Sequence, residues 1–372
     1  MPTNKNQHYV PQHYLRQFRI GDTKQISVAR IDPFEFFPTA GIKGQCQEDY
    51  FYKTDGELDR IYTTCERDLA PVISRVADKR GFDSQELTAL QLFAIIMHVR
   101  TKRAIEEAKT FPRKMFFEVT QAAIARGELP PPPADWSEKT IDFGGVAGEL
   151  FKNVAGGWLE ARSLACKLLE SPSEEFFITS DHPVILMNQM FEHTLPHRSF
   201  VGFSRSGFQM LLPVSPSLCL IFFDQRVYKV GDRKRRLVPI SQEDTELINS
   251  LQIQSAETCV FSHDPTRRDV ISNLVKKYGR LRKAVGSTLR EVSNGDEDRR
   301  VLHHFQFSPE LPRPWSFCRL RRRPRIGEDN RRDPEWTAYV KRVVEDMDAN
   351  QGRSLFESMD AVDAWLLSQA QD

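Results

Sequence analysis

Apolar residues recur at helical spacing through the first half of the chain. The pattern predicts a short helix from Pro11 to Phe18, because proline in the first helical position costs no hydrogen bond, and an amphipathic helix from Leu58 to Val76. Two more helices are predicted, one from a Ser84 cap to about Lys109 and one over residues 146–169. Gln25 to Ile31 alternates like a strand.

After Ser171 the apolar residues alternate instead, which is typical of half-buried strands. The predicted strands are Phe176–Thr179, Val184–Met187, Phe208–Val214, Leu218–Phe223 and Thr258–Ser262. Helices are expected to begin at Ser241 and after an Asp264-Pro265 cap. Because helices cluster first and strands later, we predict an α+β fold, with a helix-rich first half packed on a mixed or antiparallel sheet formed mainly by residues 176–262.

The end of the chain differs in composition from the rest. Five prolines fall between residues 309 and 334, and two acidic helices are expected after them, Trp336–Met347 and Leu355–Leu367. We therefore predict a single α+β domain over residues 1–290, a basic, proline-punctuated connector over 291–332 and an acidic helical tail over 333–372.

Composition excludes several classes of protein. The 372 residues contain no run of about eighteen apolar residues, so no membrane span is expected, and the polar start lacks the apolar region of a signal peptide. The six cysteines are scattered without a Cys-x-x-Cys pair, a pattern that predicts reduced thiols in a cytoplasmic protein instead of a disulfide frame or zinc ribbon.

Charge is unevenly distributed along the chain. Residues 226–332 hold 24 Lys and Arg against 14 Asp and Glu, a balance of +10, whereas the whole chain carries only +1. Residues 333–372 hold 3 basic and 9 acidic residues. Either the basic stretch faces an anionic partner such as nucleic acid or another phosphate-bearing ligand, or the acidic tail folds back and neutralises it. The acidic helices could instead dock a partner protein.

The first candidate site is the opening motif His-Tyr-Val-Pro-Gln-His-Tyr-Leu-Arg-Gln-Phe, residues 8–18. His8 is a candidate metal ligand or general base, because imidazole titrates near neutrality, and Gln12 and Arg16 lie one helical turn apart. The alternative is that His8 caps the short helix and its apolar neighbours fill the core. His13 is expected on a solvated helix face.

The second candidate site is Thr-Ser-Asp-His-Pro, residues 179–183. Asp181 follows an apolar strand and Pro183 ends that strand, which is a common setting for a catalytic or metal-binding carboxylate. Ser180 could add a hydroxyl contact to a ligand. The alternative is that Asp181 accepts backbone hydrogen bonds and only shapes a turn.

These two motifs and the Leu-Pro-Val-Ser-Pro turn at residues 212–216 resemble the family called domain of unknown function 4238, over roughly residues 6–265. The matching positions include His8, Ser180 and Asp181, and Arg100 is a weaker match in a helix that often carries arginine in such proteins. The family pattern usually has asparagine where this chain has His182. The resemblance implies no established reaction, substrate or cofactor.

Several enzyme classes lack their usual motifs. The chain has no P-loop, no dinucleotide-binding glycine motif after a strand, no His-Glu-x-x-His and no Gly-x-Ser-x-Gly. The arginine-rich run at residues 319–325 could bind phosphates but has no interleaved aromatic residues for base stacking.

The leading hypothesis is a metal-assisted nuclease or phosphodiesterase acting on a phosphate-containing substrate. A divalent metal ion would be held by Asp181 and His8, with His8 alternatively serving as base. Glu48, Asp49 and Glu66 are further carboxylates that could join the ion. Substrate phosphate would contact the side chains of Arg100, Gln12, Arg16 and Ser180. The alternative is a non-enzymatic ligand-binding or sensor module in which the N-terminal motif is structural.

Overall fold

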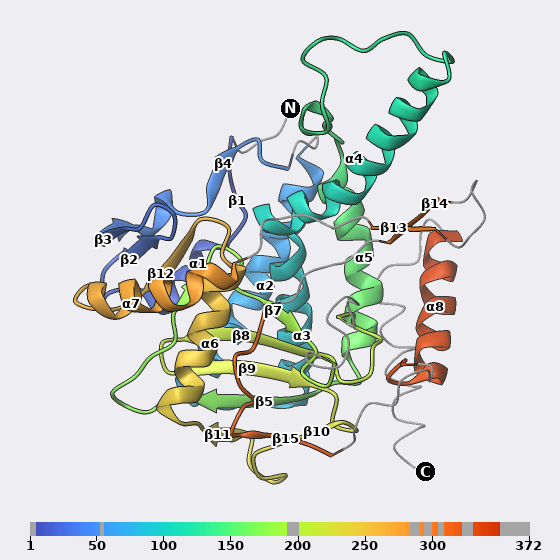
Figure 1. Ribbon diagram of the computed structural model, residues 1–372. Coiled ribbons are helices and arrows are strands. Elements are labelled where there is room, and N and C mark those ends of the chain that lie inside the picture. Colours follow the sequence, from blue (N-terminus) through green and yellow to red (C-terminus); the bar gives the residue numbers. More distant parts are fainter. Residues whose placement is uncertain are drawn as a thin grey trace.

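The computed structural model describes residues 5–52, 56–191, 201–282, 290–293, 300–303, 309–321 and 330–349 (Figure 1). Its helices are α1 Gln12–Leu15, α2 Glu57–Lys79, α3 Ser84–Val99, α4 Lys102–Ala125, α5 Val146–Ala161, α6 Gln242–Ser255, α7 Arg268–Tyr278 and α8 Pro334–Ala349. Its strands are β1 Asn6–His8, β2 Gln25–Arg30, β3 Glu35–Gly41, β4 Gln47–Asp49, β5 Ala165–Glu170, β6 Thr179–Ser180, β7 Ile185–Met187, β8 Gln209–Ser215, β9 Leu218–Phe223, β10 Tyr228–Val230, β11 Leu237–Pro239, β12 Cys259–Ser262, β13 Arg290–Ser293, β14 Arg300–His303 and β15 Cys318–Leu320. The predicted α+β class is confirmed.

The central sheet has five strands in the order β11-β5-β9-β8-β7, with one parallel pair, β11 with β5, so it is mixed. Alternate residues of β8 and β9 enter two different cores, as the period of a strand requires. Met210 and Leu212 pack with α2, α3 and α5, whereas Leu211 and Ile221 pack with α6. Figure 1 shows α6 on one face of this sheet and α3 on the other.

A second, antiparallel sheet has the order β3-β2-β12-β6 and is covered by α7. Half of it comes from the N-terminal region, so the strands are less confined to residues 176–262 than the sequence predicts. Short two-stranded ladders join β1 with β4, β10 with β15 and β13 with β14.

The helix predicted from Ser84 to Lys109 is in fact two helices, a correction that matters for the site. α3 ends at Val99, and Thr101 takes an extended conformation and caps α4 by accepting a hydrogen bond from the Ala104 amide. The N-terminal cap of α3 also lies one residue earlier than expected, because the side chain of Asp83, not Ser84, accepts the capping hydrogen bond. The break turns Arg100 and Thr101 into the interior, where both are buried.

The helix predicted over residues 146–169 ends early. α5 stops at Ala161, and Ala165–Glu170 form β5, which pairs along its whole length with β9. Pairing with a distant strand therefore outweighs the helical spacing of the apolar residues in this segment. The predicted Phe176–Thr179 strand is likewise reduced to the two residues of β6.

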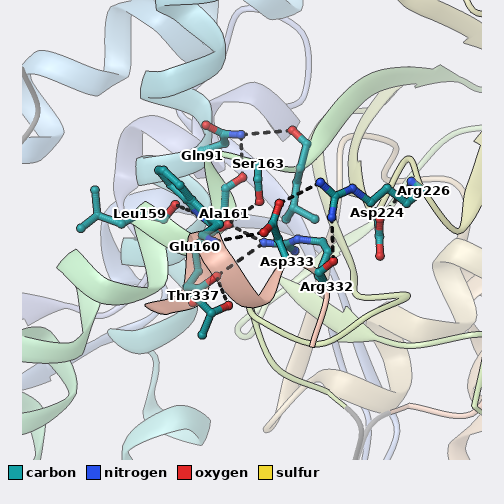
Figure 2. Close-up of polar contacts among 12 residues, drawn as sticks. Gln91, Leu159, Glu160, Ala161, Ser163, Asp224, Arg226, Arg332, Asp333 and Thr337 are labelled. Atoms are coloured by element: carbon teal, nitrogen blue, oxygen red, sulfur yellow. Dashed lines mark hydrogen bonds and ion pairs between the residues drawn. The ribbon is translucent and has the colours of Figure 1, made fainter. Parts of the chain in front are cut away.

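The start of the acidic tail lies against the main body. The indole of Trp336 in α8 donates a hydrogen bond to the Leu159 carbonyl, and Val344 packs near Gly156 of α5. Figure 2 shows the polar contacts that hold this junction, including Arg226 to Asp333 (2.8 Å) and the buried Arg332 to the Glu160 carbonyl. α8 thus packs on α5; the expected Leu355–Leu367 helix lies outside the described residues.

No described helix combines the length and apolar character needed to cross a bilayer.

Candidate functional site

The N-terminal motif is fixed by backbone pairing on both sides of His8. β1 pairs with β4, so that His8 lies opposite Gln47, and the next amide, that of Tyr9, donates to the Cys46 carbonyl. His8 Nε2 lies 3.1 Å from the Lys43 carbonyl oxygen and 3.3 Å from Gln12 Nε2. That ring nitrogen is therefore occupied in an internal hydrogen bond.

Arg100 lies at the centre of the contacts around this motif. Its guanidinium donates to the His8 carbonyl (2.7 Å) and to the Tyr52 hydroxyl (3.2 Å), and pairs with Glu66 (2.7 Å). The Tyr62 ring covers it, with 4.5 Å between the guanidinium carbon and the ring centroid. Because Arg100 is only 3 % exposed, it holds β1 against α2 and is closed to a bound ligand.

Arg100 and Glu66 each stabilise the charged form of the other. Burial by itself would lower the pKa of Arg100, but neighbouring Tyr52 and Glu66 raise it, so the guanidinium stays charged. Burial would raise the pKa of Glu66, but the contact with His13 and the charge of Arg100 lower it overall. His13, predicted to be solvated, is half-buried, and its Nδ1 lies 3.7 Å from Glu66. Gln12, the first residue of α1, is also half-buried, whereas Arg16, which follows α1, is exposed.

The second motif is bonded to its surroundings at every position. The Tyr14 hydroxyl donates to the Pro213 carbonyl (2.7 Å), so the buried Thr179 hydroxyl must donate to Tyr14 (2.7 Å). Ser180 donates to Gln252 (2.8 Å), and the same amide donates to the Pro183 carbonyl (2.8 Å). The Ser180 hydroxyl, predicted to contact substrate, is thus buried and engaged within the protein.

Asp181 is 1 % exposed, and both of its carboxylate oxygens accept hydrogen bonds. Oδ1 accepts from the Glu257 amide (2.7 Å), and Oδ2 accepts from the Thr258 amide (2.7 Å), the Thr258 hydroxyl (2.6 Å) and the Cys259 amide (3.1 Å). These donors fix the chain entering β12 beside β6. An oxygen that faces three donors is poorly placed to bind a cation.

His182, which stands where proteins of the resembled family usually have asparagine, is buried and lies against the half-buried His98. Its Nδ1 lies 2.5 Å from the Thr101 hydroxyl, and its ring centroid lies 5.3 Å from that of His98. Burial lowers the pKa of His98 to about 4. Burial, with the nearby His98 and Arg103, also lowers the pKa of His182, so both rings are neutral near pH 7.

We expect this pair to make the protein less stable in mild acid. Unfolded histidine binds a proton near pH 6.5, whereas folded His98 does so only near pH 4, so between these values the unfolded state binds more protons and acidification favours unfolding. The free energy of unfolding, measured in urea from about pH 7 to 5, should fall less steeply in His182→Asn. Equal slopes in both proteins would contradict this expectation.

The predicted residues fall into two groups. The structure brings Arg100 to His8. Gln12, the first residue of α1, contacts the His8 ring, and Arg16, which follows α1, donates to Gln12. Asp181 and Ser180 bind α6 and the start of β12 instead, and within the described residues no hydrogen bond or ion pair joins Asp181 to His8. Those residues also contain no group of three or more His, Cys, Asp or Glu able to hold a metal ion. The donor set does not fit the predicted divalent metal.

Glu48 and Asp49 are exposed on β4 and face lysines. Glu48 pairs with Lys102, and Asp49 pairs with Lys5 (3.3 Å). Sequence reasoning missed the roles of Tyr52 and Thr258, because nothing in their own segments marks them as partners of Arg100 and Asp181.

Exposed basic side chains gather elsewhere, on a basic surface formed by β10, β15 and the loop between β10 and β11. Its members are Lys229, Arg233, Lys234, Arg235, Arg319 and Arg321, all exposed. Lys229 lies directly opposite Arg319 in the antiparallel ladder. In the part of the chain that the structure describes, none of the six charged groups forms an ion pair or hydrogen bond. Figure 1 shows these strands at one edge of the molecule.

The family model described as protein of unknown function (DUF4238) matches residues 6–266. No curated protein and no solved structure matches the chain.

Proposed function

The chain belongs to the DUF4238 family, and on that premise we propose that it is a non-enzymatic binding module for a phosphate-bearing ligand. The ligand binds the basic surface, and the two polar motifs fix the N-terminal segment and the chain entering β12. The proposal retains the phosphate-bearing ligand predicted for residues 226–332. In place of a nuclease or phosphodiesterase, it adopts the alternative in which the polar motifs are structural.

One observation carries the proposal: six basic side chains are exposed together, and none of them has an acidic partner among the described residues. Like charges directly opposite each other in a ladder, such as Lys229 and Arg319, destabilise it. An anionic ligand would offset that cost. The described part of the acidic tail supports this, because α8 packs on α5 and leaves the six side chains exposed.

The buried state of the predicted catalytic groups supports the non-enzymatic reading. A general acid, base or metal ligand must reach substrate, but two of the three predicted catalytic groups, Asp181 and Arg100, are at most 3 % exposed and bonded within the protein, as is Ser180, the predicted substrate-binding residue. The third, His8, is half-buried, and its ring contacts the Lys43 carbonyl. The six free cysteines support a reducing, cytoplasmic setting for the binding function.

Removing the opposed pair should weaken binding in a salt-dependent way. In Lys229→Gln/Arg319→Gln, the affinity for labelled linear polyphosphate should fall, and the slope of log affinity against log salt should decrease by about 2, roughly one per lost phosphate contact. Fluorescence anisotropy between about 50 and 200 mM salt measures both.

Arg60→Gln/Arg67→Gln is the matched control, because it removes the same charge from exposed positions of α2. Its slope should equal that of the unaltered protein. Equal losses in both double variants would indicate only a general charge effect and would contradict a ligand site at the basic surface.

A further inference from the structure

Lys167 is a charged residue within strand β5, between Cys166 and Leu168. Its side chain is 8 % exposed and points to the loop that follows β10. There its ammonium donates to the carbonyl oxygens of Asp232 (2.8 Å), Arg233 (3.3 Å) and Arg235. Three carbonyls of one short loop are therefore held by a single cation.

The same loop is constrained at its first residue. Gly231 has φ +54°, a conformation that favours glycine, and a Cβ there would lie 2.7 Å from Val238 Cγ2. The Asp232 carboxylate accepts a hydrogen bond from the Lys234 amide (2.8 Å). Because its carbonyls turn inward to Lys167, the loop presents the exposed side chains of residues 233–235 in a fixed arrangement.

The chemistry of the basic surface favours one kind of phosphate polymer. Proteins that bind single strands combine basic grooves with aromatic side chains on which bases stack. Among the described residues, the exposed large aromatic side chains are Phe37, Tyr50 and Phe116, none of which belongs to the basic surface. A surface with cations and no stacking platform suits a duplex, whose bases are already stacked and whose phosphates face outward.

We propose that the basic surface binds a nucleic-acid duplex through its phosphates, and that Lys167 is a positioning residue that holds the 231–236 loop in the binding conformation before the duplex arrives. This inference rests on the proposed function. Lys167 makes no contact with the duplex; it lowers the entropic cost of ordering three phosphate-binding side chains.

The first experiment compares three labelled probes at equal salt: a duplex of about 20 base pairs, one strand of the same sequence, and linear polyphosphate. Tighter binding of the duplex, with little dependence on its sequence, is expected. Equal or tighter binding of the single strand would overturn the duplex assignment while leaving the proposed function intact. No binding of any probe would overturn the proposed function itself.

The second experiment separates positioning from contact. Lys167→Met should weaken duplex binding about tenfold, because the freed loop must be ordered on binding, yet leave the salt slope unchanged since every phosphate-binding charge is still present. Lys152→Met, at an exposed position of α5, should bind normally. Unchanged affinity in Lys167→Met would overturn the positioning role.

A measurement on the unaltered protein guards against a variant that fails to fold. Backbone ¹⁵N relaxation of residues 232–236 without duplex should give order parameters of about 0.85, typical of rigid backbone. Values below about 0.6 would show that the loop is not held in advance and would contradict the role of Lys167.

Discussion

Replacing Arg100 by methionine is expected to lower the free energy of unfolding by about 3 kcal/mol, because it removes one partner of a buried ion pair and leaves the other uncompensated. Glu66 loses its 2.7 Å partner, and the His8 carbonyl loses its 2.7 Å donor. Chemical denaturation of both proteins measures the change. The expected loss of stability is at the lower end for a broken buried ion pair, because Glu66 is 29 % exposed and can be hydrated.

Two further variants test the cause. Arg67→Met changes an exposed arginine next to Glu66 and should shift stability by less than about 0.5 kcal/mol. Glu66→Gln should recover part of the loss in the Arg100→Met background. Since folding lowers the pKa of Glu66, its contribution is present above the ordinary glutamate range and is lost as the pH falls through the folded value. A loss below about 1 kcal/mol in Arg100→Met would contradict the central position of this residue.

Asp181→Asn should be destabilising by about 3 kcal/mol, although it keeps the size of the side chain. An amide nitrogen would replace one oxygen and would face N–H groups that now have an acceptor, and each buried donor left unpaired costs about 1–3 kcal/mol. The three amides concerned belong to residues 257–259. Urea denaturation provides the measurement.

The same variant separates a structural role from a catalytic one. Removal of a catalytic or metal-binding carboxylate often leaves stability unchanged or raises it, because such groups are strained by function. A stable Asp181→Asn protein that has lost a metal-dependent cleavage activity present in the unaltered chain would therefore favour the nuclease hypothesis. Asp22→Asn, at a fully exposed position, is the control and should change neither property.

Local patterns predict much of the fold. Helix α2 and strands β8 and β9 lie within three residues of their expected bounds. The Ser241 side chain accepts a hydrogen bond from the Asp244 amide at the start of α6. Each of these features is set by spacing or capping within its own segment. The errors fall where distant residues decide: β5 is a strand because β9 pairs with it, and the break at Arg100 places that side chain beside Glu66 and His8.

The candidate site was predictable in its residue types but not in its geometry. The opening motif and the 179–183 motif do carry unusual numbers of hydrogen-bonding groups, and the sequence marks them for that reason. Whether such groups face a ligand or one another depends on partners such as Tyr52 and Thr258, whose positions only the tertiary structure gives. Lys167 left a usable signal, a charged residue between the apolar neighbours Cys166 and Leu168.

The pairing of β2 with β12 has a consequence for synthesis of the chain. Arg30 of β2 lies opposite Cys259 of β12. During synthesis, β2 therefore leaves the ribosome long before β12, the strand that pairs with it inside the sheet. At about 5–20 residues per second, that delay is on the order of 10 to 50 s. Throughout it, the β2–β3 hairpin has an unpaired strand edge that can join the wrong chain. We therefore expect truncated nascent chains that lack β12 to depend on chaperones.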